Sequence, residues 1–127
     1  MPEFASPYAR TLGLTLSRET GRAVVTMAPG EGVSGRPGFL HGGAISGLLD
    51  YAAWVTVMDA LEDGVRIKPV GITVDFMRGG RMENAHAAAI VVRLGRRIAN
   101  VVATAWQEDE TKPIATATLK FLVVRGA

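Results

Sequence analysis

Asp50 is the only charged residue in the stretch 44–58, whose Ala, Leu, Val and Trp residues indicate a buried helix. Burying a carboxylate without partners costs several kcal/mol, so its presence there requires a reason. One reason is chemistry, because a carboxyl group whose pKa is raised by burial can act as a general base or as a nucleophile. The other is structural: Asp50 lies on a side of the helix that faces solvent or a subunit boundary, where a neighbour satisfies it.

His41-Gly42-Gly43 directly precedes this helix. Two glycines let a ligand approach the main chain closely, and the first turn of a helix presents unpaired N–H groups with a partial positive charge. Such a terminus can stabilise a carbonyl oxygen that becomes negative during acyl transfer. The plainer interpretation is a tight turn into the helix, with His41 as a hydrogen-bonding or capping residue.

Other chemistries find little support in the sequence. It contains no G-x-S-x-G, no G-x-x-x-x-G-K-[ST], no G-x-G-x-x-G and no H-E-x-x-H. His41 and His86 lack metal-ligand spacing, so we expect no metal and interpret His86 as a structural or surface histidine. The absence of cysteine excludes a thiol nucleophile and a disulfide scaffold, and it fits a cytoplasmic location.

Charge and hydropathy limit the classes of molecule that the protein can bind. The formal net charge is +2 and only 6% of the residues are aromatic, which argues against nucleic acid. The pI near 9.4 is a mild bias toward phosphorylated or acidic ligands. The longest apolar run, 39–61, contains His41, Asp50 and Asp59, so we predict no membrane span, and no secretory signal is readable in residues 1–10. A chain of 127 residues buries only about two-thirds of its unfolded surface, which favours oligomerisation.

The elements that must position these residues can be read from the periodicity. A short helix at the start is followed by a hairpin of 12–16 and 23–27, a loop at 29–38, the helix at 44–58, and strands at 67–77, 85–94, 98–107 and 114–124. The short links 78–84, 95–97 and 108–113 favour an antiparallel meander. A helix that is apolar on nearly every side must be surrounded. We therefore predict one α+β domain, 1–127, in which a curved antiparallel sheet wraps around one long central hydrophobic helix.

The string HGGAISGLLD, followed by YAAWV, resembles the H-G-G-x-x-x-x-L-x-D signature of the PaaI-like acyl-CoA thioesterases of the hotdog-fold superfamily. The segments VGITVDFMRGG at 70–80 and LGRR at 94–97 also look similar, so the likeness spans 12–124. The resemblance implies a hotdog fold and hydrolysis of an acyl- or aryl-CoA thioester without a metal or cofactor. One departure is Gly35, where members often carry asparagine; another is Gly79, where proline is common.

The resemblance also implies roles. Asp50 would be the general base or nucleophile, and the Gly43 N–H would bind the thioester carbonyl. Thr73 would help to place water, and His41 would support the loop. Gly42 is a further substrate-binding candidate, and the implied contacts of the CoA nucleotide are, by location, Arg78, Arg81, Arg96 and Arg97. Apart from the resemblance, an apolar pocket for an aryl or medium-chain acyl group can be lined by Tyr51, Trp54, Met58, Phe76 and Met77, although aromatic and Met side chains in such stripes are more often plain core.

Two alternatives remain open. The first is a non-catalytic acyl-CoA or lipid-binding hotdog protein, which Gly35 favours, whereas Asp50 and Thr73 favour the enzyme. The second is a structural domain with an incidental aspartate.

Spacing predicts the assembly. Gly43 and Asp50 are seven residues apart, or about 10 Å along one helix, which is too far for both to grip one thioester. We therefore predict a homodimer in which the helices of two chains run antiparallel. As a separate expectation, two such dimers form a homotetramer.

Overall fold

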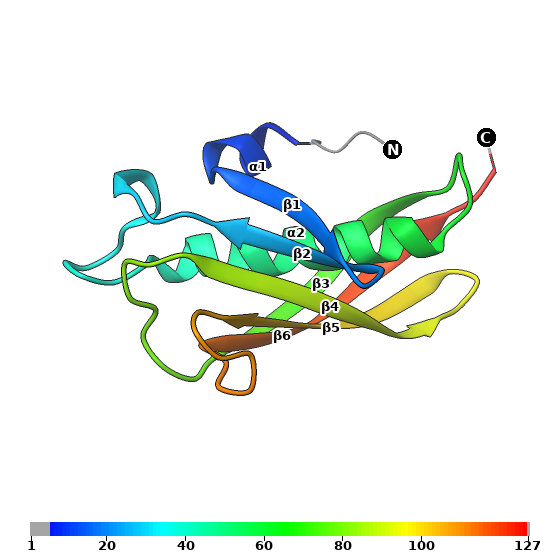
Figure 1. Cartoon of the computed structure of the whole chain (residues 1–127). Helices are drawn as coiled ribbons and strands as arrows, with labels where there is room; N and C mark the ends of the chain where they lie inside the picture. Colours follow the sequence, from blue (N-terminus) through cyan, green and yellow to red (C-terminus); the bar gives the residue numbers. More distant parts are fainter. Residues whose placement is uncertain (1–5, 127) are drawn as a thin grey trace.

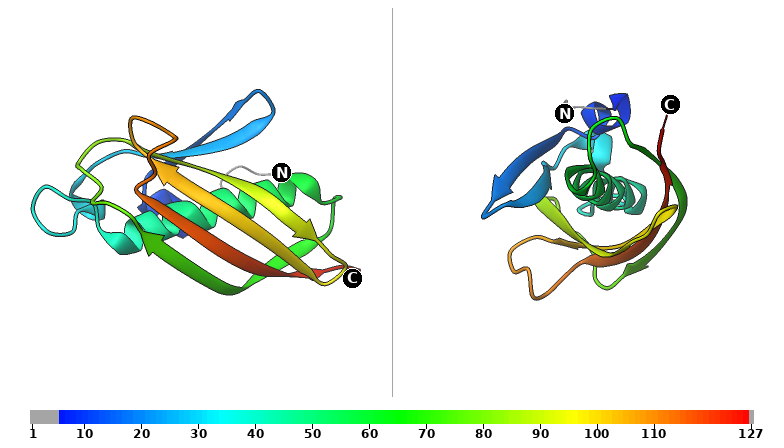
Figure 2. Two further views of the ribbon diagram at one scale, coloured as in Figure 1. Left: turned by 90° about the horizontal axis from the view of Figure 1, so that it is seen from below. Right: turned by 90° about the vertical axis from the view of Figure 1, so that its right-hand side faces the viewer.

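A single sheet curves around a single long helix in the computed structural model, which describes residues 6–126 (Figure 1). The elements are α1 (Pro7–Thr11), β1 (Leu14–Glu19), β2 (Arg22–Met27), η1 (Glu31–Val33), α2 (Gly42–Ala60), β3 (Arg66–Phe76), β4 (Ala85–Leu94), β5 (Ile98–Trp106) and β6 (Ala115–Val124). All strand pairs are antiparallel. The end-on view in Figure 2 shows α2 inside the curve of the sheet, which confirms the predicted α+β architecture.

The helix α2 begins two residues earlier and ends two residues later than the sequence predicts. Its apolar residues are buried almost all the way round because the sheet covers several of its sides at once. The buried positions are Ala44, Ile45, Leu48, Leu49, Ala52, Ala53, Val55 and Val57. Two of its polar side chains bond back to the helix main chain, since the hydroxyls of Ser46 and Thr56 donate to Gly42 O and Ala52 O at 2.9 and 2.8 Å.

Alternation along the strands decides which residues face the helix. In β6 the odd-numbered residues from Ala115 to Val123 are buried, whereas Thr118 and Lys120 are exposed, as the period of two predicts. On β4 and β5 the inward positions are mostly alanine, and their small side chains let α2 approach the sheet closely. The core therefore lies between α2 and the concave face.

The strand order corrects the predicted meander. The sheet runs β1-β2-β4-β5-β6-β3, so of the four strands after α2 only β4, β5 and β6 lie side by side in chain order. β3 pairs with β6, and β4 pairs instead with β2. A short link does not distinguish a hairpin from a crossing over the end of the sheet. Here the chain after β3 crosses that end, where Met77 N–H donates to Ile114 O at 2.8 Å and Leu40 N–H donates to Gly80 O at 2.8 Å.

The predicted N-terminal hairpin is confirmed, with a tight turn. Thr20 and Gly21 have φ values of 53° and 81°, the left-handed pair that joins strands through a two-residue loop. The first strand begins at Leu14 rather than at Leu12, because α1 and Gly13, with a φ of 68°, come before it.

β1 and β3 form the two edges of the sheet. On β3 the side chains of Val70, Ile72 and Phe76 are about half exposed, at 56%, 46% and 54%. An edge strand with exposed apolar side chains and unpaired main-chain groups is a surface suited to pairing with another strand. Within the described part of the chain, no helix is long and apolar enough to span a membrane.

Candidate active site

The N-terminus of α2 opens into a hollow of about 580 Å³ between the start of the helix and the end of β3. His41 is the N-cap, with extended backbone angles, and its Nδ1 accepts the Gly43 N–H at 2.8 Å. The bond to His41 therefore occupies the Gly43 N–H, which the family resemblance assigns to the substrate carbonyl. Among residues 6–126, Gly42 N–H has no hydrogen-bond partner, and Gly42 lines the hollow. The open donor at this terminus is therefore Gly42 rather than Gly43.

Close packing explains the glycines around this terminus. A Cβ on Gly43 would lie 3.0 Å from His41 Nδ1, and one on Gly42 would lie 3.3 Å from the Phe76 ring. At Gly35 a Cβ would lie 3.1 Å from His41 Cα, so a side chain at this position would require His41 to move by a few tenths of an ångström.

Asp50 lies in a second hollow, of about 330 Å³, on the side of α2 that faces the start of β3. Its walls are Ser6, Asp50, Tyr51, Trp54, Pro69 and Phe121. Tyr51 and Trp54 stack with their ring centroids 5.9 Å apart. Burial raises the pKa of the Asp50 carboxyl, and no described cation pairs with it. The site combines a partly buried carboxylate with an aromatic wall, which suits a base or nucleophile beside an apolar substrate group.

One chain holds these two hollows apart. Gly42 and Asp50 are eight residues apart on α2, which corresponds to about 12 Å along the helix axis. Both hollows border the free edge strand, one at Pro69 and the other at Phe76. The two halves of the predicted site therefore lie in separate hollows that both border β3.

Thr73 lies apart from Asp50 within one chain, so its role in placing water stays a prediction. Thr73 pairs with Thr118, an exposed residue between the buried Ala117 and Leu119. Paired residues share a face of the sheet, so Thr73 lies on the convex face, away from α2. It lines a third hollow there, of about 420 Å³, together with Val92 and Thr118.

The four predicted nucleotide-binding arginines form two pairs at opposite ends of α2. Arg78 and Arg81 follow β3 near the helix N-terminus, and Arg78 lines the first hollow. Arg96 and Arg97 form the turn between β4 and β5, which lies near the chain's C-terminus at the far end of the helix (Figure 2). Arg125 Nε donates to Arg96 O at 3.3 Å at that end. One chain alone cannot direct all four side chains to a single nucleotide.

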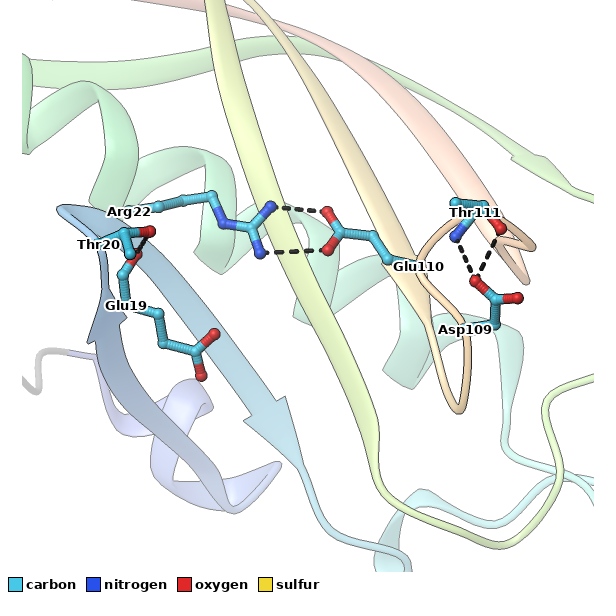
Figure 3. Close-up of polar contacts among 6 residues, drawn as sticks. All are labelled: Glu19, Thr20, Arg22, Asp109, Glu110 and Thr111. Carbon is cyan, nitrogen blue, oxygen red and sulfur yellow. Dashed lines mark hydrogen bonds and ion pairs between the residues drawn. The ribbon is translucent and has the colours of Figure 1, made fainter.

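Sequence reasoning missed a polar and aromatic cluster on the convex face. His86 Nδ1 lies 2.8 Å from Thr26 Oγ1, and its ring lies 5.9 Å from that of Trp106, so the prediction that His86 is structural agrees with its surroundings. Arg22 lies over Trp106 and forms two bonds with Glu110, at 2.6 and 3.2 Å (Figure 3). This pairing raises the pKa of Arg22 and lowers that of Glu110. The loop after β5 is thus fastened across β2.

Gln107 is a second residue that sequence reasoning missed. Its carboxamide bonds to main-chain atoms of Arg81 and Glu83, beside the first hollow. A lone glutamine after a strand carries no distinctive signal. Within residues 6–126 no cluster of three or more His, Cys, Asp or Glu side chains is placed to hold a metal ion.

Comparison with known proteins identifies the class. The sequence matches the thioesterase superfamily over residues 37–114. This range includes α2, which borders both hollows, and the segment that crosses the end of the sheet after β3. The chain belongs to this superfamily, and it is a thioester hydrolase with the hotdog fold.

Particular relatives agree with that assignment. The medium/long-chain acyl-CoA thioesterase YigI of Escherichia coli (strain K12) is 28% identical, over 92% of this chain and 85% of its own length. A thioesterase family protein from Silicibacter pomeroyi superposes with a TM-score of 0.86 at 27% identity, covering 95% of this chain and 91% of that chain. A Bacillus halodurans protein crystallised with CoA shares the fold, with a TM-score of 0.89 at 23% identity over 99% of this chain and 83% of that chain.

Proposed function

We propose that this protein hydrolyses an acyl- or aryl-CoA thioester to the free acid and CoA. The observation that carries the proposal is the Asp50 carboxylate, which is partly buried beside the stacked rings of Tyr51 and Trp54 and has no cation partner among residues 6–126. The activity in the name of the Escherichia coli relative and the CoA in the Bacillus halodurans structure support the choice of substrate.

In the proposed reaction, the thioester carbonyl oxygen accepts a hydrogen bond from Gly42 N–H at the start of α2. Asp50 then either takes a proton from water, whose oxygen attacks the carbonyl carbon, or attacks that carbon itself to form an anhydride that water hydrolyses. In both routes the carbon–sulfur bond breaks, and the sulfur leaves as the CoA thiolate, which takes up a proton. The partial positive charge of the helix terminus stabilises the oxyanion.

The proposed site is shared between two chains. If β3 pairs with the partner's β3 in antiparallel fashion, the Pro69 end of one strand meets the Phe76 end of the other. Asp50 of one chain then lies beside the partner's Gly42, although the two residues are about 12 Å apart along one helix. The exposed apolar side chains of β3 support this pairing, because they would be covered in the dimer.

The same pairing unites the arginines. The end of one chain that carries Arg96 and Arg97 comes next to the partner's Arg78 and Arg81. Four guanidinium groups then lie close together at one end of the shared site, where they suit the phosphates of CoA. We propose that both pairs contact the nucleotide of one substrate molecule.

A tetramer would cover the convex face. Ile90, Val92 and Val70 are 70%, 64% and 56% exposed there, around the hollow that Thr73 lines. Packing two convex faces together would bury this apolar surface. We therefore propose a homotetramer. We also propose a cytoplasmic location, which the lack of cysteine favours.

The acyl group is proposed to occupy the hollow beside Asp50. Its volume of about 330 Å³ and its aromatic wall suit an aryl or medium-length acyl group. Phe76 and Met77 line the other hollow, at the helix N-terminus, rather than this one.

The experiment is a hydrolysis screen of short, medium, long and aromatic acyl-CoAs, with released thiol as the readout. Turnover that peaks at medium or aromatic groups is expected. Tight binding of these esters without release of thiol would favour the alternative, a non-catalytic acyl-CoA-binding protein, for which the glycine at position 35 is the one favourable feature.

A further inference from the structure

Gln107 makes an unusually complete set of bonds to the segment that follows β3. Its Oε1 accepts the Arg81 N–H at 3.0 Å, and its Nε2 donates to Arg81 O at 2.7 Å. Nε2 also lies 3.4 Å from Glu83 O. The carboxamide thus pairs with the main chain of Arg81 in both directions, as a neighbouring strand would, and fixes its position.

The segment held in this way forms a wall of the helix N-terminal hollow. Gly79 and Gly80 line it, and Gly80 O accepts the Leu40 N–H at 2.8 Å. Phe39 forms an isolated β-bridge with Arg81, and a Cβ on Gly79 would lie 2.8 Å from the Phe39 ring. A shift of Arg81 would therefore displace the residues just before the start of α2.

The loop that carries Gln107 has its own anchors. Glu110 is bonded to Arg22, and Asp109 accepts bonds from the main chain and hydroxyl of Thr111 at 2.9 and 2.7 Å (Figure 3). Ile114 N–H donates to Ala105 O at 2.8 Å. None of these contacts involves the segment after β3. Gln107 can thus be changed while the rest of the loop keeps its anchors.

Arg81 depends on this support because its side chain is weakly held. Its ion pairs with Glu83 and Glu108 are long, at 3.9 and 4.0 Å, and the side chain is 64% exposed. Such surface pairs contribute little to position. Together with the β-bridge to Phe39, the main-chain bonds to Gln107 place Arg81 relative to the hollow.

We propose that Gln107 is a positioning residue: its carboxamide sets where Arg81 meets the phosphates of the substrate. The inference rests on the proposed acyl-CoA hydrolysis and assigns to Gln107 a role that neither sequence pattern nor family match provides. We expect Gln107 to contact neither the thioester nor the Asp50 carboxylate. Its loss should affect recognition of the nucleotide rather than the chemical step.

The test compares two thioesters with the same acyl group, one of CoA and one of pantetheine, which lacks the nucleotide. In Gln107→Ala, the KM for the CoA ester is expected to rise about tenfold, from the loss of two main-chain bonds. The KM for the pantetheine ester and kcat for both should change less than twofold, by the same argument. Thr111→Ala is the matched control, because it removes a side-chain bond from the same loop without touching Arg81.

A second variant separates the two hydrogen bonds. Gln107→Glu keeps an acceptor for Arg81 N–H but loses the donor to Arg81 O, so an intermediate rise in KM is expected. Equal KM changes for both esters, or a loss of kcat alone, in either variant would overturn the inference. If the wild-type protein cleaves neither ester, the proposed function itself is wrong, and the role of Gln107 falls with it.

Discussion

His41 accepts the Gly43 N–H through Nδ1 at 2.8 Å, so the cap of α2 occupies one of the two glycine donors. The neighbouring Gly42 N–H is left to the hollow. The Gly43 N–H thus stabilises the start of the helix, whereas the Gly42 N–H stays available to a ligand.

The cap contributes to stability, and this can be measured. We expect His41→Ala to lower the free energy of unfolding by about 1 kcal/mol, the usual effect of losing a side-chain N-cap. His41→Asn, which can accept the same N–H, should retain most of it. Urea unfolding of the three proteins at equal concentration checks the prediction. Identical midpoints for wild type and the alanine variant would show that the bond contributes nothing.

Asp50→Asn tests the assignment of the base or nucleophile. The amide has the same size but can neither deprotonate water nor attack the carbonyl as a carboxylate does. We expect kcat to fall by about 10²–10⁴-fold, the range typical of a lost general base. The KM for the acyl-CoA and the circular dichroism spectrum should stay near the wild-type values. A folded variant with full turnover would remove Asp50 from the mechanism.

The same substitution should change stability in a pH-dependent way. Burial raises the pKa of Asp50, so the folded protein binds more protons than the unfolded chain between the ordinary value of about 3.9 and the raised one. Its contribution to stability is therefore present below about pH 3.9 and is lost as the pH rises through the folded pKa. Asp50→Asn should be more stable than wild type at pH 7, with the difference shrinking toward pH 4. A difference that is constant with pH would contradict this.

How much of this arrangement the sequence predicts depends on the distance over which each feature is encoded. The helix and β6 are local: an apolar circumference at 44–58 and the alternation of Thr116, Thr118 and Lys120 fix their environments. The pairing of β3 with β6 is not local, because a short link of polar and glycine residues fits both a hairpin and a crossing. Because the sequence analysis predicted a hairpin between β3 and β4, it did not predict the contact between residues 78–84 and the loop after β5.

The site shows the same division. The spacing of the glycines and Asp50 is written in one helix, so the sequence places them correctly. It does not reveal that Gly43 N–H is taken by the cap, because His41 could equally have turned outward. The face on which Thr73 lies is not predictable from alternation alone, because it is decided only once its partner, Thr118, is known.

The two arginine pairs make a prediction that distinguishes one shared nucleotide site from two unrelated surfaces. Arg78→Ala with Arg81→Ala, and Arg96→Ala with Arg97→Ala, should each raise the KM for acyl-CoA more than for the pantetheine ester. Both effects should weaken with added salt, since phosphate contacts at a surface are screened. An effect confined to one pair would mean that the other end of the molecule does not contact the nucleotide.

The shared site itself is tested by mixing two inactive chains. Gly42 is the first residue of α2, where proline is tolerated and removes the N–H, and the extended backbone of His41 before it is compatible with proline. Gly42→Pro should therefore abolish turnover with the helix intact. Gly42→Ala is its control, because it adds a Cβ near the Phe76 ring but keeps the N–H, and most of the activity should remain.

Gly42→Pro chains are then combined with inactive Asp50→Ala chains under conditions that let subunits exchange. In a mixed dimer one site carries both defects and the other carries neither, since each site takes Asp50 from one chain and Gly42 from its partner. Random exchange makes half of the dimers mixed, each with one intact site, so about a quarter of the wild-type activity should return. If mixed dimers form and stay inactive, each site takes both residues from a single chain, and the antiparallel pairing of β3 with the partner's β3 is wrong.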